Sequence, residues 1–466
     1  MHYPSVSSQR TSVRPVAASV LLSWACILAP SSATAAAATA VEAAAPDDEA
    51  RWVEVRCGIV LDVEQRRALR EQRILIEGAW IRAIGGEVDA PPDVELQTID
   101  LSDHVCMPGL MDAHVHLFID LVGRTLDEAA PTQSSAYNAL MGLRNAQTLL
   151  RLGFTTIRVP GDMDYHYAGI ELRDAIARGE FRGPRMFVAP HAISPFGGHG
   201  DFNSYAPDLP HLVQGPMIAD GVDAVRRAVR REIKYGADWI KVMASGGVMS
   251  QHDDPEVAAY SAEEFRAFVE EAHRHRKKIT AHAHGDAGIR AAVEAGFDSI
   301  EHATLMEPET ARLMAERGTF YVPTVYVVDW ILERGASGGI SANNLEKAEL
   351  VSKRHGESVA LATEAGVRLV IGSDPIFPME EAIREFTALA KRVRDNWTVL
   401  RAGTLHAAEM LGIDDELGSL AVGKRADLVA TPRSPIEQMM NIEQVDFVMQ
   451  DGLVVHDGRD GERASP

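Results

Sequence analysis

Residues 238–247 read DWIKVMASGG, and this stretch is predicted to be a buried β-strand that ends at two glycines. Apolar residues lie on both sides of a single lysine, Lys241. A lysine is rarely buried without a partner, and an ionised amine loses solvation when it leaves water. The stretch therefore predicts either a functional site around Lys241 or an amine that reaches past a rim to solvent.

This strand is one of eight apolar, strand-like runs that alternate with segments of helical period. The runs are 109–117, 155–160, 185–189, 239–245, 278–284, 299–304, 320–325 and 368–374. Amphipathic stretches such as 220–237 and 261–277 lie between them, and Ser261 with Glu264 has the sequence of a helix capping box. Eight strands alternating with helices over roughly 300 residues favour the α/β class and a (β/α)8 TIM barrel. No Gly-rich dinucleotide fingerprint follows the first run, which argues against an open nucleotide-binding sheet.

Both ends of the chain carry short alternating strands with glycine-containing turns, which is typical of a small β unit. These segments are 52–63, 73–86, 96–109, 418–432 and 445–458. We therefore predict a β-sandwich domain built from both chain ends, residues 48–107 and 413–466, around a barrel domain of residues 108–412. The Gly-, Pro- and His-rich stretch at about 190–220 is too long for an ordinary loop and is predicted to border the active site.

Residues 1–40 have the order of features of a secretory signal peptide. Two arginines precede an apolar run at 16–30, which is followed by an alanine-rich segment. The run is too short for a comfortable membrane span, so we expect cleavage after Ala35 or Ala40 and export to the periplasm or the medium. The alternative interpretation is a disordered alanine-rich start.

The chain has three cysteines. Cys26 lies inside the predicted signal peptide without a convincing lipobox, which disfavours a lipid anchor. Cys57 and Cys106 remain after cleavage, and they could form one disulfide in an oxidising compartment. We expect both instead to be free and buried.

The composition is that of an ordinary globular protein, with 46% hydrophobic and 24% charged residues. The length of 466 residues allows more than one domain. The formal net charge of -21 leaves no basic stripe for phosphates, so a nucleic-acid partner is not expected. No membrane span is predicted either, and a small-molecule or dipeptide substrate is the expected partner.

Histidines and acids fall at one end of several predicted strands, where a barrel places its catalytic groups. With Lys241 in the fourth strand, they are His114, His116, His282, His284, His302 and Asp374. His114 and His116 share one side because a strand has a period of two. His273 and His275 have the same spacing but fall on a predicted polar helix, where they do not share a face. The latter pair is predicted to be solvated.

Joint placement of these groups predicts two metal ions. The first and eighth strands are neighbours in a closed barrel, so His114, His116 and Asp374 are predicted to share one ion. His282 and His302 lie on adjacent strands about 5 Å apart and could share a second. Imidazole and carboxylate ligands suit zinc or a similar first-row divalent ion. Any one of these histidines alone could equally be a satisfied core residue.

Five motifs follow one another along the predicted strands: MPGLMDAHVHL (107–117), WIKVMASGG (239–247), AHAHG (281–285), SIEHAT (299–304) and IGSD (371–374). With these motifs in this order, the sequence resembles the amidohydrolase superfamily, and the flanking strands resemble its small β-sandwich. It is most similar to the branch of imidazolonepropionase-related proteins that contains Xaa-Pro dipeptidases, other carboxypeptidase-like enzymes and ochratoxinase-type amidases. The resemblance covers nearly the whole chain after residue 40.

In that family the lysine of the fourth strand is carboxylated by carbon dioxide and bridges two metals. The resemblance therefore implies an N6-carboxylysine at Lys241, shared between the two ions. Burial lowers the pKa of a lysine, so a neutral amine would be available for this reaction. Relatives of this branch commonly assemble, often into octamers, so a homo-oligomer is expected.

Two metals can activate a water and polarise a carbonyl group. Asp374 is the predicted general base, which passes a proton to the leaving amine. His284 either polarises the substrate or supports the ligands by a hydrogen bond, and the sequence leaves both roles open. The candidates for substrate binding are His191, His199, Arg158 and Tyr326, of which Arg158 is suited to a carboxylate.

We therefore expect hydrolysis of an amide whose leaving group is an amino acid with a free carboxylate. This class includes dipeptides such as Xaa-Pro, N-acyl amino acids and ochratoxin-type aryl amides. The same site would also serve a cyclic amidase, a lactonase or a phosphotriesterase. A non-catalytic scaffold is the third alternative, and the presence of every expected ligand type argues against it.

Overall fold

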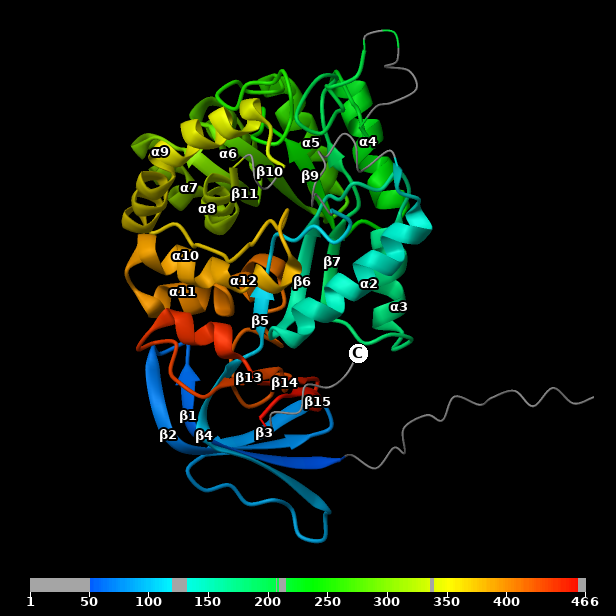
Figure 1. Ribbon diagram of the computed structural model, residues 1–466. Helices are drawn as coiled ribbons and strands as arrows, with labels where there is room; N and C mark the ends of the chain where they lie inside the picture. The colour runs from blue at the N-terminus through cyan, green and yellow to red at the C-terminus, as the bar shows by residue number, and fades with distance from the viewer. Residues whose placement is uncertain (1–50, 120–131, 207, 209–214, 336–338, 460–466) are drawn as a thin grey trace, which may run out of the picture. The chain divides into compact units, whose positions relative to one another are not determined.

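A computed structural model of the chain describes residues 51–119, 132–206, 208, 215–335 and 339–459 (Figure 1). The predicted signal peptide, residues 1–40, lies outside this described part. Among the described helices, none combines the length and the apolar character that a membrane span needs. The fold is of the α/β class: one mainly antiparallel sheet is followed in the chain by parallel strands that alternate with helices.

Both ends of the chain contribute to one seven-stranded sheet, in the order β15-β14-β13-β4-β1-β2-β3. The N-terminal part provides β1 (Trp52–Asp62), β2 (Arg67–Glu77), β3 (Trp80–Gly85) and β4 (Leu96–Pro108), and the C-terminal part provides β13 (Leu428–Thr431), β14 (Phe447–Gln450) and β15 (Leu453–Asp457). The two parts meet where Ala430 of β13 pairs antiparallel with Cys106 of β4. The strands thus pair as one continuous sheet, where the sequence predicted a sandwich. The predicted domain boundaries stay predictions.

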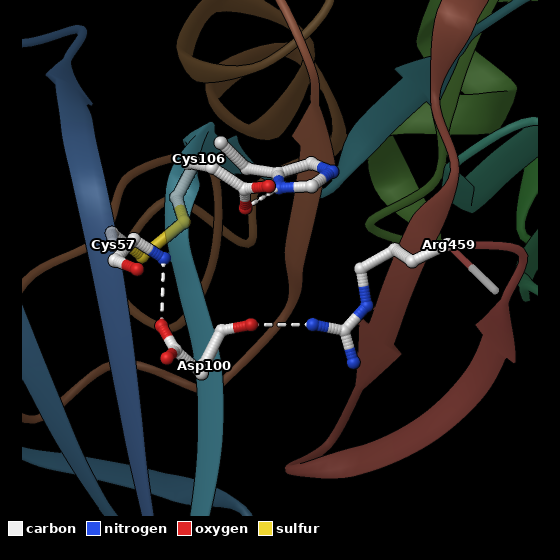
Figure 2. Close-up of a disulfide and its surroundings, with 7 residues drawn as sticks. Cys57, Asp100, Cys106 and Arg459 are labelled. Atoms are coloured by element: carbon white, nitrogen blue, oxygen red, sulfur yellow. Dashed lines mark hydrogen bonds and ion pairs between the residues drawn. A yellow bond between two sulfur atoms is a disulfide. The ribbon is translucent and has the colours of Figure 1, made fainter.

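Cys57 of β1 and Cys106 of β4 form a disulfide with a Cα–Cα distance of 6.0 Å (Figure 2). The expectation that both thiols are free is therefore wrong. A regular parallel register would place Cys106 about 16 Å along β1 from Cys57. Instead, Cys57 pairs with Leu101 and Ile59 pairs with Val105, so β4 uses four residues where β1 uses two. This irregularity, which the strand pattern does not reveal, brings the two cysteines together.

The parallel strands fall into two sheets. One contains β5 (Leu110–Asp112), β6 (Phe154–Pro160) and β7 (Arg185–Ala189), and the other contains β8 (Ala192–Ile193), β9 (Trp239–Met243), β10 (Lys278–Gly285), β11 (Ser299–Leu305) and β12 (Phe320–Val322). Seven of the eight predicted runs are therefore strands. The short β8 lies in the Gly-, Pro- and His-rich stretch at about 190–220, which was predicted to border the active site.

The eighth predicted run, 368–374, is not a strand, although single hydrogen bonds hold it between β12 and β5. Val370 N donates to Tyr321 O at 2.8 Å, and Ala113 N donates to Ile371 O at 2.8 Å. The approach is close: a Cβ added to Gly372 would lie 2.4 Å from a methyl of Val322. These contacts agree with a ring of eight strands, but the pairing leaves two sheets, so a closed barrel stays a prediction.

Helices follow most of the parallel strands. They are α2 (Ser135–Arg151), α3 (Ala168–Ala177), α4 (Val222–Lys234), α5 (Ala262–Arg274), α6 (Asp286–Ala295), α7 (Pro308–Arg317), α8 (Val325–Arg334), α9 (Ala342–Ala365), α10 (Arg384–Val393), α11 (Asn396–Ala402) and α12 (Leu405–Leu411), with 3-10 turns at Met379–Glu381 and Met439–Gln444. The capping box predicted at Ser261 and Glu264 is confirmed at the start of α5, because both of its reciprocal hydrogen bonds are present. The helix therefore begins where the sequence predicted.

Removing the disulfide is expected to destabilise the fold. The bridge closes a loop with a sequence separation of 49 residues, and a cross-link of this kind typically stabilises a protein by about 2–4 kcal/mol. A Cys57→Ala/Cys106→Ala double variant should therefore lose about that much free energy of unfolding, measured by urea denaturation. An unchanged midpoint in the double variant would show that the bridge contributes nothing.

Candidate active site

The ends of the parallel strands surround an open cavity. Its lining includes all six predicted metal ligands, His114, His116, Lys241, His282, His302 and Asp374, together with His284. These seven side chains are called the cavity floor below. Apolar residues line much of the remaining wall, among them Met163, Met249, Val328, Ile331 and Ile376. The lining of the cavity thus combines these seven polar side chains with apolar ones.

His114, His116 and Asp374 form the tightest cluster of potential ligands. One ligand atom from each lies within 4.8 Å of the others. The Nε2 atoms of His114 and His116 are 3.3 Å apart, and His116 Nε2 is 3.1 Å from Asp374 Oδ1. Both histidines lie just past β5, which ends at Asp112. The buried Asp112 carboxylate accepts from the backbone N–H groups of His114 and Ser373, at 3.1 Å each, and so ties the two segments together.

The ring nitrogens on the far side of these histidines have fixed partners. Glu301 Oε2 accepts from His114 Nδ1 at 2.7 Å, and Gly161 O accepts from His116 Nδ1 at 2.7 Å. A carboxylate and a carbonyl oxygen only accept, so each Nδ1 carries a proton. When the rings are neutral, the lone pair of each Nε2 then faces the space between His114, His116 and Asp374. Two lone pairs this close together repel each other, so a cation between them would be stabilising.

His282 and His302 form the second predicted pair. Their rings are 4.5 Å apart between centroids, from the paired strands β10 and β11. His302 Nδ1 lies 2.7 Å from Thr324 Oγ1 and 3.8 Å from Asp374 Oδ2. The two pairs of histidines are therefore neighbours across Asp374.

The backbone around this site is strained. Non-glycine residues with a positive φ include His302 (70°), Thr324 (50°) and Asp374 (49°). L-residues rarely adopt this conformation, and it persists only where the surrounding structure enforces it, commonly at functional sites. The predicted ligands His302 and Asp374, and Thr324 beside His302, are therefore held in a backbone conformation that L-residues disfavour.

Lys241 is buried in β9, with 2% of its surface exposed, and it lines the cavity floor. The alternative in which its amine reaches past a rim to bulk solvent does not fit this position. Burial lowers the pKa of Lys241 to about 8, against the opposing charges of Glu301 and Asp374. More of the amine is therefore neutral near pH 7 than in an exposed lysine.

Burial also lowers the pKa of the site imidazoles, to about 4 for His114 and about 3 for His284. The pKa of His282 and of His302 lies well below the ordinary value for the same reason. His116 differs: burial opposes its protonation, but its hydrogen bond to Asp374 outweighs burial and raises its pKa. Most of these rings are thus neutral, which is the form that binds metals.

Glu301 is a functional residue that the sequence analysis missed. Its fully buried carboxylate accepts from His114, from the Thr280 hydroxyl and from Arg158 Nη2, the last at 2.6 Å. Burial opposes its ionisation, but the Arg158 charge and the His114 hydrogen bond hold the pKa of Glu301 well below its ordinary range. The available signal was a glutamate beside His302 within an otherwise apolar strand.

Arg158 requires a correction. The sequence suggested that it binds a substrate carboxylate, but its side chain is fully buried and it does not line the described cavity. Its guanidinium donates to Ala113 O at 2.6 Å, to Ser299 Oγ at 3.1 Å and to Glu301. A substrate would have to displace all three partners. Arg158 therefore supports the ligands from behind.

His191 and Tyr326 also lie away from the described cavity lining. His191 Nδ1 is 3.0 Å from both carboxylate oxygens of Glu232. The Tyr326 hydroxyl donates to Glu381 and accepts from Arg384 at 3.0 Å. These partners hold both side chains in the surrounding framework, so neither predicted contact with substrate fits its position.

His199 and His284 do line the cavity. The His199 ring stacks on His282, with centroids 4.3 Å apart. His284 Nδ1 lies 2.9 Å from Thr304 Oγ1, so its Nε2 is the nitrogen left for a substrate. Of the four predicted substrate-binding residues, the structure thus brings only His199 to the cavity.

Comparisons with known proteins agree with this geometry. Residues 105–455 match the amidohydrolase family. Ochratoxinase from Aspergillus niger is 33% identical over 415 residues, which cover 85% of this chain and 84% of that protein. Its crystal structure superimposes with a TM-score of 0.78 at 31% identity, over 88% of this chain and 97% of that one.

Two further relatives extend this picture. A Xaa-Pro dipeptidase, solved with methionine bound in its active site, has a TM-score of 0.81 at 32% identity and covers 87% of this chain and 100% of that one. Imidazolonepropionase from Cupriavidus pinatubonensis is 24% identical over 409 residues, which cover 80% of this chain and 86% of that protein. The chain therefore belongs to the amidohydrolase family. Within it, the chain falls in the imidazolonepropionase-related branch and is a hydrolase that acts on amide bonds.

Glu301→Gln is expected to weaken metal binding by about 10- to 100-fold, because an amide no longer fixes the His114 tautomer or neutralises Arg158. Metal retained after dialysis against a graded series of chelator concentrations measures this change. Glu309→Gln is the matched control, because the Glu309 side chain is 61% exposed on α7. Equal metal retention in the two variants would contradict the role of Glu301.

Proposed function

We propose that this protein is an exported, binuclear metal-dependent amidohydrolase that releases an amino acid with a free carboxylate from a small amide. We further propose that its two parallel sheets and the segment 368–374 together form one (β/α)8 barrel. The observation that carries the proposal is the convergence of four histidines, Asp374 and Lys241 on one cavity floor. These groups come from five segments: the turn after β5, the strands β9, β10 and β11, and the run 368–374. Catalytic groups of a barrel come from several strands in this way.

The donor set fits divalent cations. His114, His116 and Asp374 would hold one ion, since their ligand atoms already lie within 4.8 Å of one another. His282 and His302 would hold a second ion, with Lys241, once carboxylated, shared between the two. Nitrogen and oxygen ligands of this mix suit zinc or a similar first-row ion. When bound, such ions supply a Lewis acid for the substrate carbonyl and favour deprotonation of an attacking water.

The chain itself manages the proton. Burial opposes the ionisation of Asp374, but its interactions with His114, His116 and Lys241 outweigh burial and hold the pKa of Asp374 well below the ordinary range. A carboxylate at this point can take a proton from the attacking water and deliver it to the leaving amine nitrogen. His284 presents Nε2 to the cavity and either contacts the substrate or supports the ligands.

Two observations support the proposed substrate class. Two relatives at more than 30% identity are named as an ochratoxinase and a Xaa-Pro dipeptidase, and the second name denotes cleavage of an amide bond next to an amino acid. The wall residues Met163, Met249, Val328 and Ile331 are apolar, which suits an apolar side chain or acyl group.

The disulfide supports export. Disulfides persist in oxidising compartments and are rare in the cytosol, and Cys57 is joined to Cys106. Protein recovered from the periplasm or the medium should therefore start after Ala35 or Ala40 and carry no alkylatable thiol. Intact-mass measurement before and after alkylation tests this, and a full-length, thiol-bearing product would contradict export.

A substrate screen tests the proposed reaction. It should include N-acyl amino acids and dipeptides with varied C-terminal residues, a cyclic amide, a lactone and a phosphotriester. We expect release of a free amino acid from members of the first two groups, and an amine-specific assay measures this release. Turnover restricted to the cyclic amide, the lactone or the phosphotriester would overturn the proposal in favour of that chemistry.

Lys241→Ala is expected to abolish activity and to lower the metal content from two ions per chain, because the bridging anion is lost. A short carboxylic acid such as propionate should partly restore the rate by filling the vacated position. Metal analysis and rates with and without the acid measure both effects. Lys353→Ala, an exposed lysine on α9, is the control, and full activity in Lys241→Ala would rule out the bridging role.

A further inference from the structure

A buried chain of polar groups runs from α9 to the cavity residue His199. Lys347 Nζ donates to Asp253 Oδ1 at 2.5 Å, and Ser250 Oγ lies 2.7 Å from both oxygens of the same carboxylate. Ser250 Oγ is also 2.7 Å from His199 Nδ1. These residues belong to three segments that are far apart in the sequence, and nothing in the proposed chemistry uses the chain beyond His199.

The charged pair at the far end of this chain is fully engaged. Lys347 is 9% exposed, and its ammonium also donates to Gly247 O and to Ser250 O, each at 3.1 Å. Its three protons therefore have three acceptors. Asp253 Oδ2 accepts in addition from Gly247 N at 2.9 Å. An ammonium 2.5 Å away keeps this carboxylate ionised.

The direction of the hydrogen bonds follows from this ionised carboxylate. Asp253 has no proton, so the single hydroxyl proton of Ser250 points toward it. Ser250 Oγ must then accept from His199, which places a proton on His199 Nδ1. In the neutral imidazole, Nε2 is left as a hydrogen-bond acceptor. No described residue forms a hydrogen bond with this nitrogen, and the ring lines the cavity.

Packing fixes the plane of the ring. His282 stacks on it with an interplanar angle of 28°. Gly247 lies against it so closely that an added Cβ would be 2.2 Å from the ring carbon Cε1. His282 and Gly247 thus confine the plane of the ring. The carboxylate of Asp253 lies 3.8 Å from Nδ1, which also favours a proton on this nitrogen.

We propose that Lys347, acting through Asp253 and Ser250, is a positioning residue that holds His199 with its proton on Nδ1, so that Nε2 accepts the N–H of a secondary-amide substrate. The inference rests on the proposed function and narrows its substrate class. Amides of primary amino acids have this N–H, whereas amides of proline or of N-methyl amino acids lack it. The site therefore discriminates between the two groups.

A matched substrate pair tests this preference: an N-acylalanine and the same acyl group on N-methylalanine. The wild-type protein should have the higher kcat/KM for the N-acylalanine, by about 3- to 10-fold, which is the typical effect of one hydrogen bond. Ser250→Ala, which leaves the Lys347–Asp253 pair in place, and Lys347→Met should both lose this preference. Lys353→Met should keep it. An unchanged preference in Ser250→Ala would overturn the proposal.

Nitrogen-15 NMR of histidine-labelled protein reads the tautomer directly, with the His199 signals assigned by their loss in His199→Gln. We expect a protonated Nδ1 and an unprotonated Nε2 in the wild type, and a changed ratio in Ser250→Ala. A protonated Nε2 in the wild type would refute the inference. This readout does not need turnover, so absence of amide hydrolysis would count against the proposed function while the spectrum still decides the tautomer.

Discussion

The buried carboxylate of Glu301 holds the centre of this site together. It accepts from His114 and Arg158, at 2.7 Å and 2.6 Å, and from Thr280, and its side chain has no exposed surface. Removal of either Arg158 or Glu301 would leave the other charge uncompensated in a low-dielectric interior, which is strongly destabilising. Three strands, β6, β10 and β11, therefore meet at one carboxylate, and the orientation of His114 follows from that contact.

The balance of charge on the cavity floor is also compatible with the proposed metal ions. Lys241 is the one lysine or arginine among the described lining residues. In its ammonium form it places a positive charge near Asp374 and Glu301. Carboxylation would replace its positive charge with a negative one and leave the floor strongly anionic. Buried charge of this kind must be compensated, and neutral imidazoles offer the lone pairs that divalent ions bind. The lysine and the histidines thus make chemical sense only together.

Much of this was legible in the sequence. The period of the apolar runs located seven of the parallel strands, and the capping signature located the start of α5. The ligand set was readable because strand ends converge in this class of fold, so His114 and Asp374 could be joined across 260 residues of chain. The eighth run is not a regular strand, because single hydrogen bonds to Tyr321 and Ala113 take the place of a continuous ladder.

What the sequence determined by itself is the class of fold, the family and the set of groups that reach the cavity floor, because periodicity and residue type depend only on local order. Only the tertiary structure decided what supports those groups. The irregular register of β4 brings Cys57 and Cys106 together. The buried position of Arg158 makes it a support for His114 and Glu301 and not a contact for substrate. Lys347 of α9 is connected to His199 through Asp253 and Ser250. Such contacts depend on distances between segments that share no local pattern, so no spacing along the chain can reveal them.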